Sequence, residues 1–117
     1  MFNIRTFVSI GMLCLTVGCA SMAQRGAVSR AYGYMQQGQY DLALDELSRA
    51  EHYTAPSPLT AAEISFLRGQ CYDRSSRASE ARGAYLYTMQ KFPGTIYARQ
   101  AQERLTAMKE LTEPPKD

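Results

Sequence analysis

From about residue 24 onward, the apolar residues recur every three or four positions, which is the spacing of one face of an α-helix. Clusters of glycine, serine and proline interrupt this periodicity. The pattern predicts five helices, over residues 24–37, 40–53, 60–74, 77–91 and 95–111. The chain of 117 residues is therefore expected to be all-α, with a single modest domain.

Signals at the helix ends support these boundaries. Thr60 and Glu63 form a capping box, so a helix is predicted to begin at Thr60. Thr95 follows Pro93 and Gly94 and is the predicted N-cap of the last helix. The apolar positions of the second and last helices are Leu42, Leu44, Leu47 and Ala50, and Ala98, Ala101, Leu105, Met108 and Leu111. The other face of the last helix is polar, as the end of a helix stack requires.

The start of the chain, up to Cys19, follows a different pattern. A short positive segment, Met1 to Arg5, precedes an apolar run at positions 6–17, and Gly18 and Cys19 follow. This is the anatomy of a signal peptide. A helix that spans a bilayer needs about 20 apolar residues, so the run is expected to be a leader rather than a permanent span.

The end of this leader, LTVGCA at positions 15–20, resembles the lipobox of bacterial lipoproteins, in which small residues precede a cysteine that is acylated on sulfur. It departs from that family at Thr16, where leucine is usual. The resemblance implies that residues 1–18 are a removed signal peptide and that Cys19 carries lipid at the start of a short linker, residues 19–23. Two or three acyl chains give stable anchoring, at about 0.8 kcal/mol per buried methylene.

The resemblance to lipoproteins also bears on location. Ala20 and Ser21 follow the cysteine, and neither is the aspartate associated with retention in the inner membrane. The implied location is therefore the outer membrane, with the protein facing the periplasm. The alternative is ordinary signal cleavage after Ala20 or Ala23, which would release a soluble protein.

The cysteines and the single histidine indicate no metal site. The three cysteines include no CxxC pair, and His52 has no second histidine to share a metal with. His52 is expected at the surface. Because Cys14 leaves with the leader and Cys19 carries lipid, Cys71 has no partner for a disulfide and is expected to be a buried thiol.

Two segments of the chain, residues 31–50 and 69–88, align with an offset of 38. The aligned pairs are Ala31 and Gly69, Tyr34 and Tyr72, Ala43 and Ala81, Leu47 and Tyr85, and Ala50 and Thr88. These positions resemble tetratricopeptide repeats, where small residues let the helices of a hairpin approach closely. The resemblance implies an α-solenoid fragment over residues 24–111: two helix-turn-helix units, a C-terminal capping helix and a tail at 112–117. The length beyond the family's usual period is expected in the loop at residues 52–61.

Composition narrows the function. The chain has 13 Lys and Arg against 11 Asp and Glu, and the charges are interspersed, so no nucleic-acid partner is expected. It has no GxSxG elbow, phosphate-binding glycine loop or paired histidines. The carboxylates of its second predicted helix, Asp41, Asp45, Glu46 and Glu51, are expected to be solvated. The chain is therefore expected to be neither an enzyme nor a binder of small-molecule substrates or cofactors, apart from the lipid on Cys19.

By the family resemblance, the first helices of the units line a groove that binds proteins. The groove positions are Val28, Tyr32, Met35 and Gln36 in the first unit, and Phe66, Gln70, Asp73 and Arg74 in the second. Such a mixed surface suits an extended or helical segment of a partner. Val28 and Phe66 are alternatively core or dimer contacts.

The expected function is thus that of a membrane-anchored adaptor or scaffold in a complex of the bacterial cell envelope, concerned with assembly, secretion or pili, or peptidoglycan. Two alternatives remain at this stage: a self-associating structural protein of the envelope, and a non-catalytic accessory to an envelope enzyme. The partner is accordingly another envelope protein, or the chain itself as a homo-oligomer, because two repeats bury little surface on their own.

Overall fold

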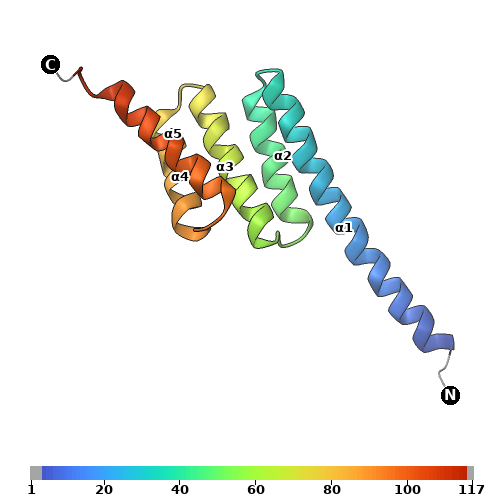
Figure 1. The fold of residues 1–117 in the computed structure, drawn as a ribbon. Helices are drawn as coiled ribbons and strands as arrows, with labels where there is room; N and C mark the ends of the chain where they lie inside the picture. Colours follow the sequence, from blue (N-terminus) through green and yellow to red (C-terminus); the bar gives the residue numbers. More distant parts are fainter. Residues whose placement is uncertain (1–3, 116–117) are drawn as a thin grey trace.

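The computed structural model describes the backbone of residues 4–115 and the side chains of residues 18–115. The described part of the chain is all-α and contains five helices (Figure 1): α1 (Ile4–Gln36), α2 (Tyr40–Tyr53), α3 (Pro58–Arg74), α4 (Ala78–Lys91) and α5 (Ile96–Thr112). The predicted fold class and the number of helices are confirmed. Residues 1–3 of the predicted leader and residues 116–117 of the predicted tail lie outside the described residues.

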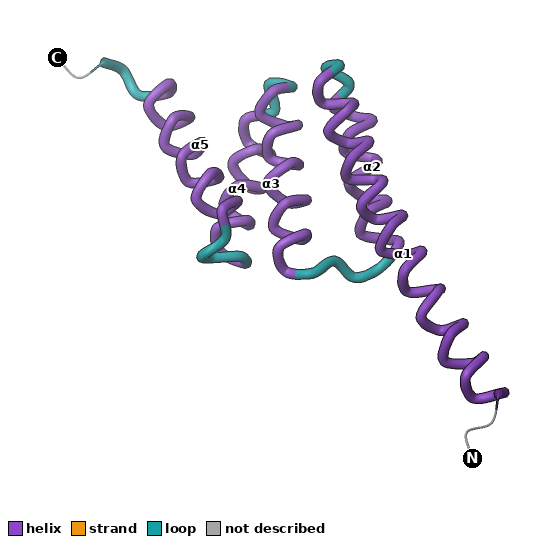
Figure 2. The backbone as a smooth tube through the Cα atoms, turned by 45° about the vertical axis from the view of Figure 1, so that its right-hand side comes forward, coloured by secondary structure: helices purple, strands orange, loops and turns teal. Residues whose placement is uncertain are grey.

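The helices form two antiparallel hairpins, α1–α2 and α3–α4, and α5 packs against the second hairpin. The tight turns within the hairpins lie at one end of the molecule, and the loops that join successive hairpins lie at the other (Figure 2). The first half of α1 extends beyond the packed helices at the end that carries the loops (Figure 1). The molecule is therefore a row of stacked helix pairs, and each helix pairs mainly with its neighbours in sequence.

The repeat offset found in the sequence holds for every later helix boundary. α2 begins at Tyr40 and α4 at Ala78, and both helices have the same length, as do α3 and α5, which begin at Pro58 and Ile96. The turns also correspond, because Gly38 and Ser76 both adopt positive φ, at 73° and 62°. α5 is therefore the first helix of a third unit.

The expected insertion in the loop at residues 52–61 is wrong. The connection between α2 and α3 occupies only positions 54–57, and the connection between α4 and α5, at positions 92–95, has the same length. The loop after α2 therefore contains no insertion relative to the loop after α4, and both repeats share the longer period.

The starts of two helices correct the sequence prediction. α1 begins at Ile4 rather than at residue 24, so it includes most of the predicted leader. α3 begins at Pro58, and its N-cap is Ser57, whose Oγ accepts a hydrogen bond of 3.2 Å from the Thr60 amide. Proline suits the first helical position because its missing N–H needs no partner there. The Ser57–Pro58 pair thus starts the helix earlier than the capping box predicted.

The equivalent cap in the next repeat is as predicted. Thr95 precedes α5, and its Oγ1 accepts a hydrogen bond of 3.1 Å from the Ala98 amide. Ser57 and Thr95 occupy the same position in successive repeats, so the two helices begin in the same way.

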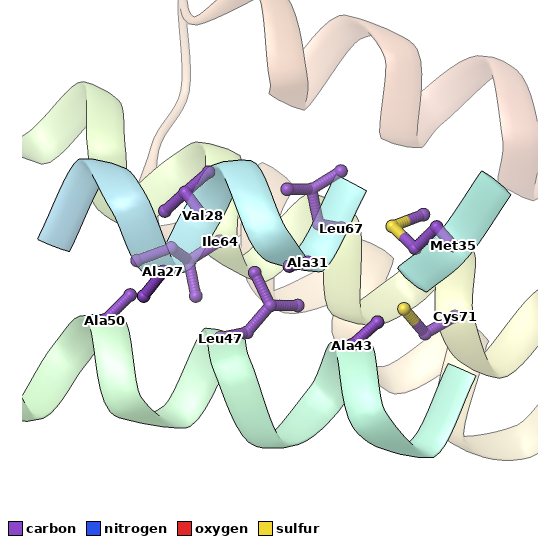
Figure 3. Close-up of a cluster of buried hydrophobic side chains, with 10 residues drawn as sticks. All are labelled: Ala27, Val28, Ala31, Met35, Ala43, Leu47, Ala50, Ile64, Leu67 and Cys71. Atoms are coloured by element: carbon purple, nitrogen blue, oxygen red, sulfur yellow. The ribbon is translucent and has the colours of Figure 1, made fainter. Parts of the chain in front are cut away.

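The first hydrophobic core lies between α1, α2 and α3. Its members are Ala27, Val28, Ala31, Met35, Ala43, Leu47, Ala50, Ile64, Leu67 and Cys71 (Figure 3). Leu47 points from α2 toward Ala31 of α1, and both are fully buried (Figure 3). Cys71 is also fully buried, as predicted, and burial raises the pKa of its thiol to about 11.

The second core lies between α3, α4 and α5 and depends on a close fit at Gly69. A methyl group on Gly69 would lie 2.5 Å from Cε1 of Tyr85, so only glycine lets that ring pass. The equivalent pair in the first unit is Ala31 and Leu47. Ala31 is larger than Gly69, and Leu47 is correspondingly smaller than Tyr85. The two hairpins fill the same space with different residues.

Two predictions about α2 are corrected. Leu42 is 45% exposed, whereas Glu46 is buried. Arg30 of α1 donates to Glu46 at 3.0 Å and Arg49 donates to it at 3.2 Å. Glu46 is therefore not a solvated carboxylate but one that joins α1 to α2. Within the same helix, His52 is exposed, as predicted.

The face by which the second hairpin stacks on the first is absent from α1. Ile64, Leu67 and Cys71 form this face in α3. The equivalent positions of the preceding repeat are Gly26, Ser29 and Gly33, which offer little apolar surface. The stack therefore begins at α1.

At the other end of the stack, α5 carries a charged residue at a position where α3 packs against α4. Ser65 and Gly69 face α4, where Ser65 Oγ lies 2.6 Å from Thr88 Oγ1 and Gly69 contacts Tyr85. The equivalent residues of α5 are Glu103, which is exposed, and Ala107. This agrees with the predicted polar face of the last helix. Leu111, which was predicted to share the apolar face of α5, is 84% exposed.

Candidate functional site

Along one side of the molecule lie the first helices of the three units, where α3 contacts both α1 and α5. The Tyr32 hydroxyl of α1 donates to Glu63 of α3 at 2.7 Å. Farther along, Arg104 of α5 donates to Asp73 of α3 at 2.6 Å. We call the exposed surface of these three helices the first-helix face. It is built by the same geometry in each unit.

A polar hollow of about 360 Å³ lies on the first-helix face between α3 and α5. Its lining consists of Gln70, Asp73, Arg74, Tyr85 and Arg104. In α3, Asp73 and Arg74 follow Gln70 by three and four positions, so all three lie on the same side of that helix. Tyr85 reaches the hollow from α4 because Gly69 leaves room for its ring.

The charges in this hollow are partly balanced from within. Asp73 accepts two hydrogen bonds from Arg104, at 3.0 and 2.6 Å, and a third from the Tyr85 hydroxyl at 3.2 Å. Burial, and then the negative charge of Asp73, raise the pKa of Tyr85, so its hydroxyl stays protonated and acts as a donor. Asp73 is thereby held in place on α3.

Gln70 and Arg74 differ from Asp73 in having no hydrogen-bonding or ionic side-chain partner within residues 18–115. Arg74 is exposed and Gln70 is half-buried. Their amide and guanidinium groups are thus available to a ligand at the rim of the hollow. A guanidinium can bind a carboxylate through two hydrogen bonds, and an amide can pair with a peptide group.

The structure divides the predicted groove residues into two groups. Gln70, Asp73 and Arg74 meet in the hollow, and Tyr32 and Gln36 are exposed at the equivalent end of α1. By contrast, the apolar members are buried in the two cores and are only 4–8% exposed: Val28, Met35 and Phe66. For Val28 and Phe66 this is the core role that the sequence left open.

Sequence reasoning missed four residues: Glu63, Tyr97 and Arg104 of the first helices, and Tyr85, which lines the hollow from α4. Three contacts join residues that lie 31 positions apart: Tyr32 with Glu63, Phe66 with Tyr97, and Asp73 with Arg104. This interval of 31 is about two helical turns shorter than the repeat offset of 38. The difference arises because neighbouring first helices lie side by side with a shift along their axes. A search for complementary residues at this interval would have identified three of the four.

The predicted lipidation site lies next to the packed part of the molecule. Cys19 is exposed on α1, which continues through Gly18 and Cys19 without a break. Gln24, one turn farther along, is buried, and its side-chain amide donates to the carbonyls of Ala50 and Thr54 at 3.1 and 2.9 Å. The contacts that hold α1 to α2 thus begin just after the predicted linker.

Two further findings concern the described residues. No helix among them is long and apolar enough to cross a membrane. Within the same part of the chain, no three His, Cys, Asp or Glu side chains gather as metal ligands would.

Fold and site together define a short helical-repeat protein with two complete units and the first helix of a third. Comparison with protein-family models, with curated proteins and with solved structures gives no match for this chain. Its function is therefore inferred from its own residues.

Proposed function

We propose that this chain is a bacterial lipoprotein with tetratricopeptide-like repeats, anchored through Cys19, that acts as an adaptor in a cell-envelope complex. The observation that carries the proposal is the hollow on the first-helix face, where Gln70 and Arg74 stand beside the internally bonded Asp73. An adaptor needs a preformed surface with free hydrogen-bonding groups, because an ordered site loses little entropy on binding.

The position of Cys19 supports the anchor. The thiol is exposed, and Gln24 is the first buried residue of the described side chains. Removal of residues 1–18 would therefore leave the contacts between α1 and α2 intact. With Ala20 and Ser21 next to the cysteine, the proposed location is the outer membrane, with the repeats facing the periplasm.

The chemistry of the hollow indicates the kind of partner. Arg74 offers a planar cation and Gln70 a donor and an acceptor, so the complementary group is a carboxylate side chain next to an accessible peptide. We therefore propose an extended or helical segment of another envelope protein, carrying Asp or Glu, as the ligand. The closed ends of the stack argue against end-to-end self-assembly as the main role.

The test is an affinity pull-down of the full-length chain from crosslinked, detergent-solubilised native membranes. We expect the double variant Gln70→Ala/Arg74→Ala to lose a specific envelope protein while keeping its helical circular dichroism. The matched control is Arg82→Ala/Gln90→Ala, which removes the same two groups from the exposed surface of α4.

Loss of the partner in the first variant but not in the control would support the adaptor role. Equal recovery with both variants would move the binding site away from the hollow. Recovery of the chain with itself alone would instead favour a self-associating structural protein.

A further inference from the structure

Both loops between hairpins lie at the end of the molecule from which the first half of α1 projects (Figures 1 and 2). The first loop, residues 54–57, separates α2 from α3, and the second, residues 92–95, separates α4 from α5. We call this end, with the adjoining helix ends, the loop edge. Cys19 lies on the part of α1 that leaves the molecule there.

Large apolar side chains are exposed along the loop edge. Tyr53 ends α2, Leu59 is the second residue of α3, and Ile96 begins α5; their exposed fractions are 45%, 57% and 49%. Met22 of α1 is 74% exposed. Met22 lies at the same level, because the nearby Gln24 donates to the Thr54 carbonyl. An apolar row of this kind, on several elements at one end, marks an interaction surface.

Among the described residues, three unpaired cations lie near this edge. Arg25 of α1, Lys91 at the end of α4 and Arg99 in the first turn of α5 are exposed, and none forms an ion pair within residues 18–115. Of the nearest carboxylates, Glu51 pairs with Arg68 at 2.7 Å, and Glu63 accepts the Tyr32 hydroxyl but keeps its charge. The edge thus combines apolar tips with available cations.

We propose that the loop edge rests on the surface of the lipid bilayer that holds Cys19. The apolar tips enter the headgroup region, and Arg25, Lys91 and Arg99 lie against anionic lipid phosphates. A bilayer fits this combination because amphipathic surfaces bind it through buried apolar area and attraction to anionic lipids together. This inference rests on the proposed anchor, since the acyl chains bring the edge to the membrane.

The consequence is an orientation. With the loop edge on the bilayer, the hairpin axes stand away from the membrane and the turns at residues 37–39 and 75–77 point into the surrounding compartment. The hollow at Gln70 and Arg74 lies toward the turn end of α3, since Arg74 is the last residue of that helix. Its partner would therefore be bound at a fixed distance above the membrane.

The test uses the absence of tryptophan from the chain. Three single-tryptophan variants are made in the full chain: Leu59→Trp and Ile96→Trp at the loop edge, and Leu42→Trp as the control. Leu42 is 45% exposed and lies near the start of α2, at the turn end. Each protein is extracted from native membranes and reconstituted into vesicles of phosphatidylethanolamine and phosphatidylglycerol, with or without brominated acyl chains.

We expect the emission of Leu59→Trp and Ile96→Trp to shift to the blue in vesicles and to be quenched by the brominated lipids, while Leu42→Trp keeps its emission. Vesicle flotation and intact mass test the anchor separately in the same samples. A lipidated chain that floats but shows no quenching at either edge position overturns the loop-edge proposal and leaves the anchor standing. A chain without lipid that does not float overturns both.

Discussion

At the residue scale, the size of a single side chain decides how closely each hairpin packs. Gly69 lies against the ring of Tyr85, and Ala31 occupies the equivalent place beside Leu47. The sequence alignment placed both pairs in register, but it could not show that the glycine is required by the aromatic ring opposite. That requirement depends on a distance, which no repeat pattern contains.

A methyl group at Gly69 should therefore destabilise the protein. Gly69→Ala places a Cβ 2.5 Å from the Tyr85 ring, and we expect a loss of about 1–3 kcal/mol in the free energy of unfolding. Gly83→Ala in α4 is the control, because nothing lies within 4 Å of its Cβ. It should stabilise the helix by about 0.5–1 kcal/mol. Urea unfolding measures both, and equal effects would refute the proposed fit.

Burial of Cys71 should make stability depend on pH. The thiol has its pKa raised from 9.0 to about 11 in the folded chain. The unfolded chain therefore loses this proton first, so the stabilisation is complete below pH 9 and declines as the pH rises toward 11, by up to about 2–3 kcal/mol. Cys71→Ala should show a correspondingly shallower decline in urea unfolding over that range. Parallel pH profiles for the two proteins would contradict the burial effect.

At the scale of single helices, sequence periodicity predicted α2 at its observed bounds and α4 and α5 closely, but it misplaced the starts of α1 and α3 and misread one face. α3 begins at Ser57–Pro58 because both residues favour a helix start, and the later Thr60 signal is then redundant. Glu46 was taken as solvated because one of its arginine partners, Arg30, comes from another helix, although the other, Arg49, is three positions away in α2. Local patterns contain no such tertiary pairing.

The two helix caps give a direct test of these boundaries. Ser57→Ala and Thr95→Ala should each lower the free energy of unfolding by about 0.5–2 kcal/mol, since each removes the side-chain acceptor of a first-turn amide. Thr60→Ala should cost less, because Thr60 lies inside the helix. Thermal unfolding of the three variants decides the matter. A larger loss at Thr60 than at Ser57 would restore the capping box as the helix start.

The pairing of Asp73 with Arg104 is expected to contribute to the docking of α5 on α3. A double-mutant cycle with Asp73→Asn and Arg104→Gln should give a coupling energy of about 0.5–1 kcal/mol, because the arginine remains partly exposed. Chemical unfolding at low and high salt measures it. The coupling should shrink as salt rises. A coupling energy of zero would mean that apolar packing alone holds α5.

At the scale of the whole molecule, the repeat shows how the two ends of the described stack differ from its middle. The helix boundaries recur at one constant offset, yet the stacking positions become Gly26, Ser29 and Gly33 at one end, and Glu103 replaces Ser65 at the other. The sequence predicted the polar face of the last helix from the spacing of its apolar residues. It did not predict the hollow, because Arg104 and Tyr85 come from helices that only the fold brings beside Gln70 and Arg74.

The central claim is that this helical repeat is held on a membrane by lipid at Cys19. Its most direct test is the intact mass of the protein extracted from native membranes, beside a Cys19→Ser variant. We expect a chain that begins at Cys19 and carries two or three acyl groups, and a variant that keeps its leader and gains no lipid. A lipid-free chain that begins at Ser21 or Gln24 would contradict the anchor and identify an exported, soluble repeat protein.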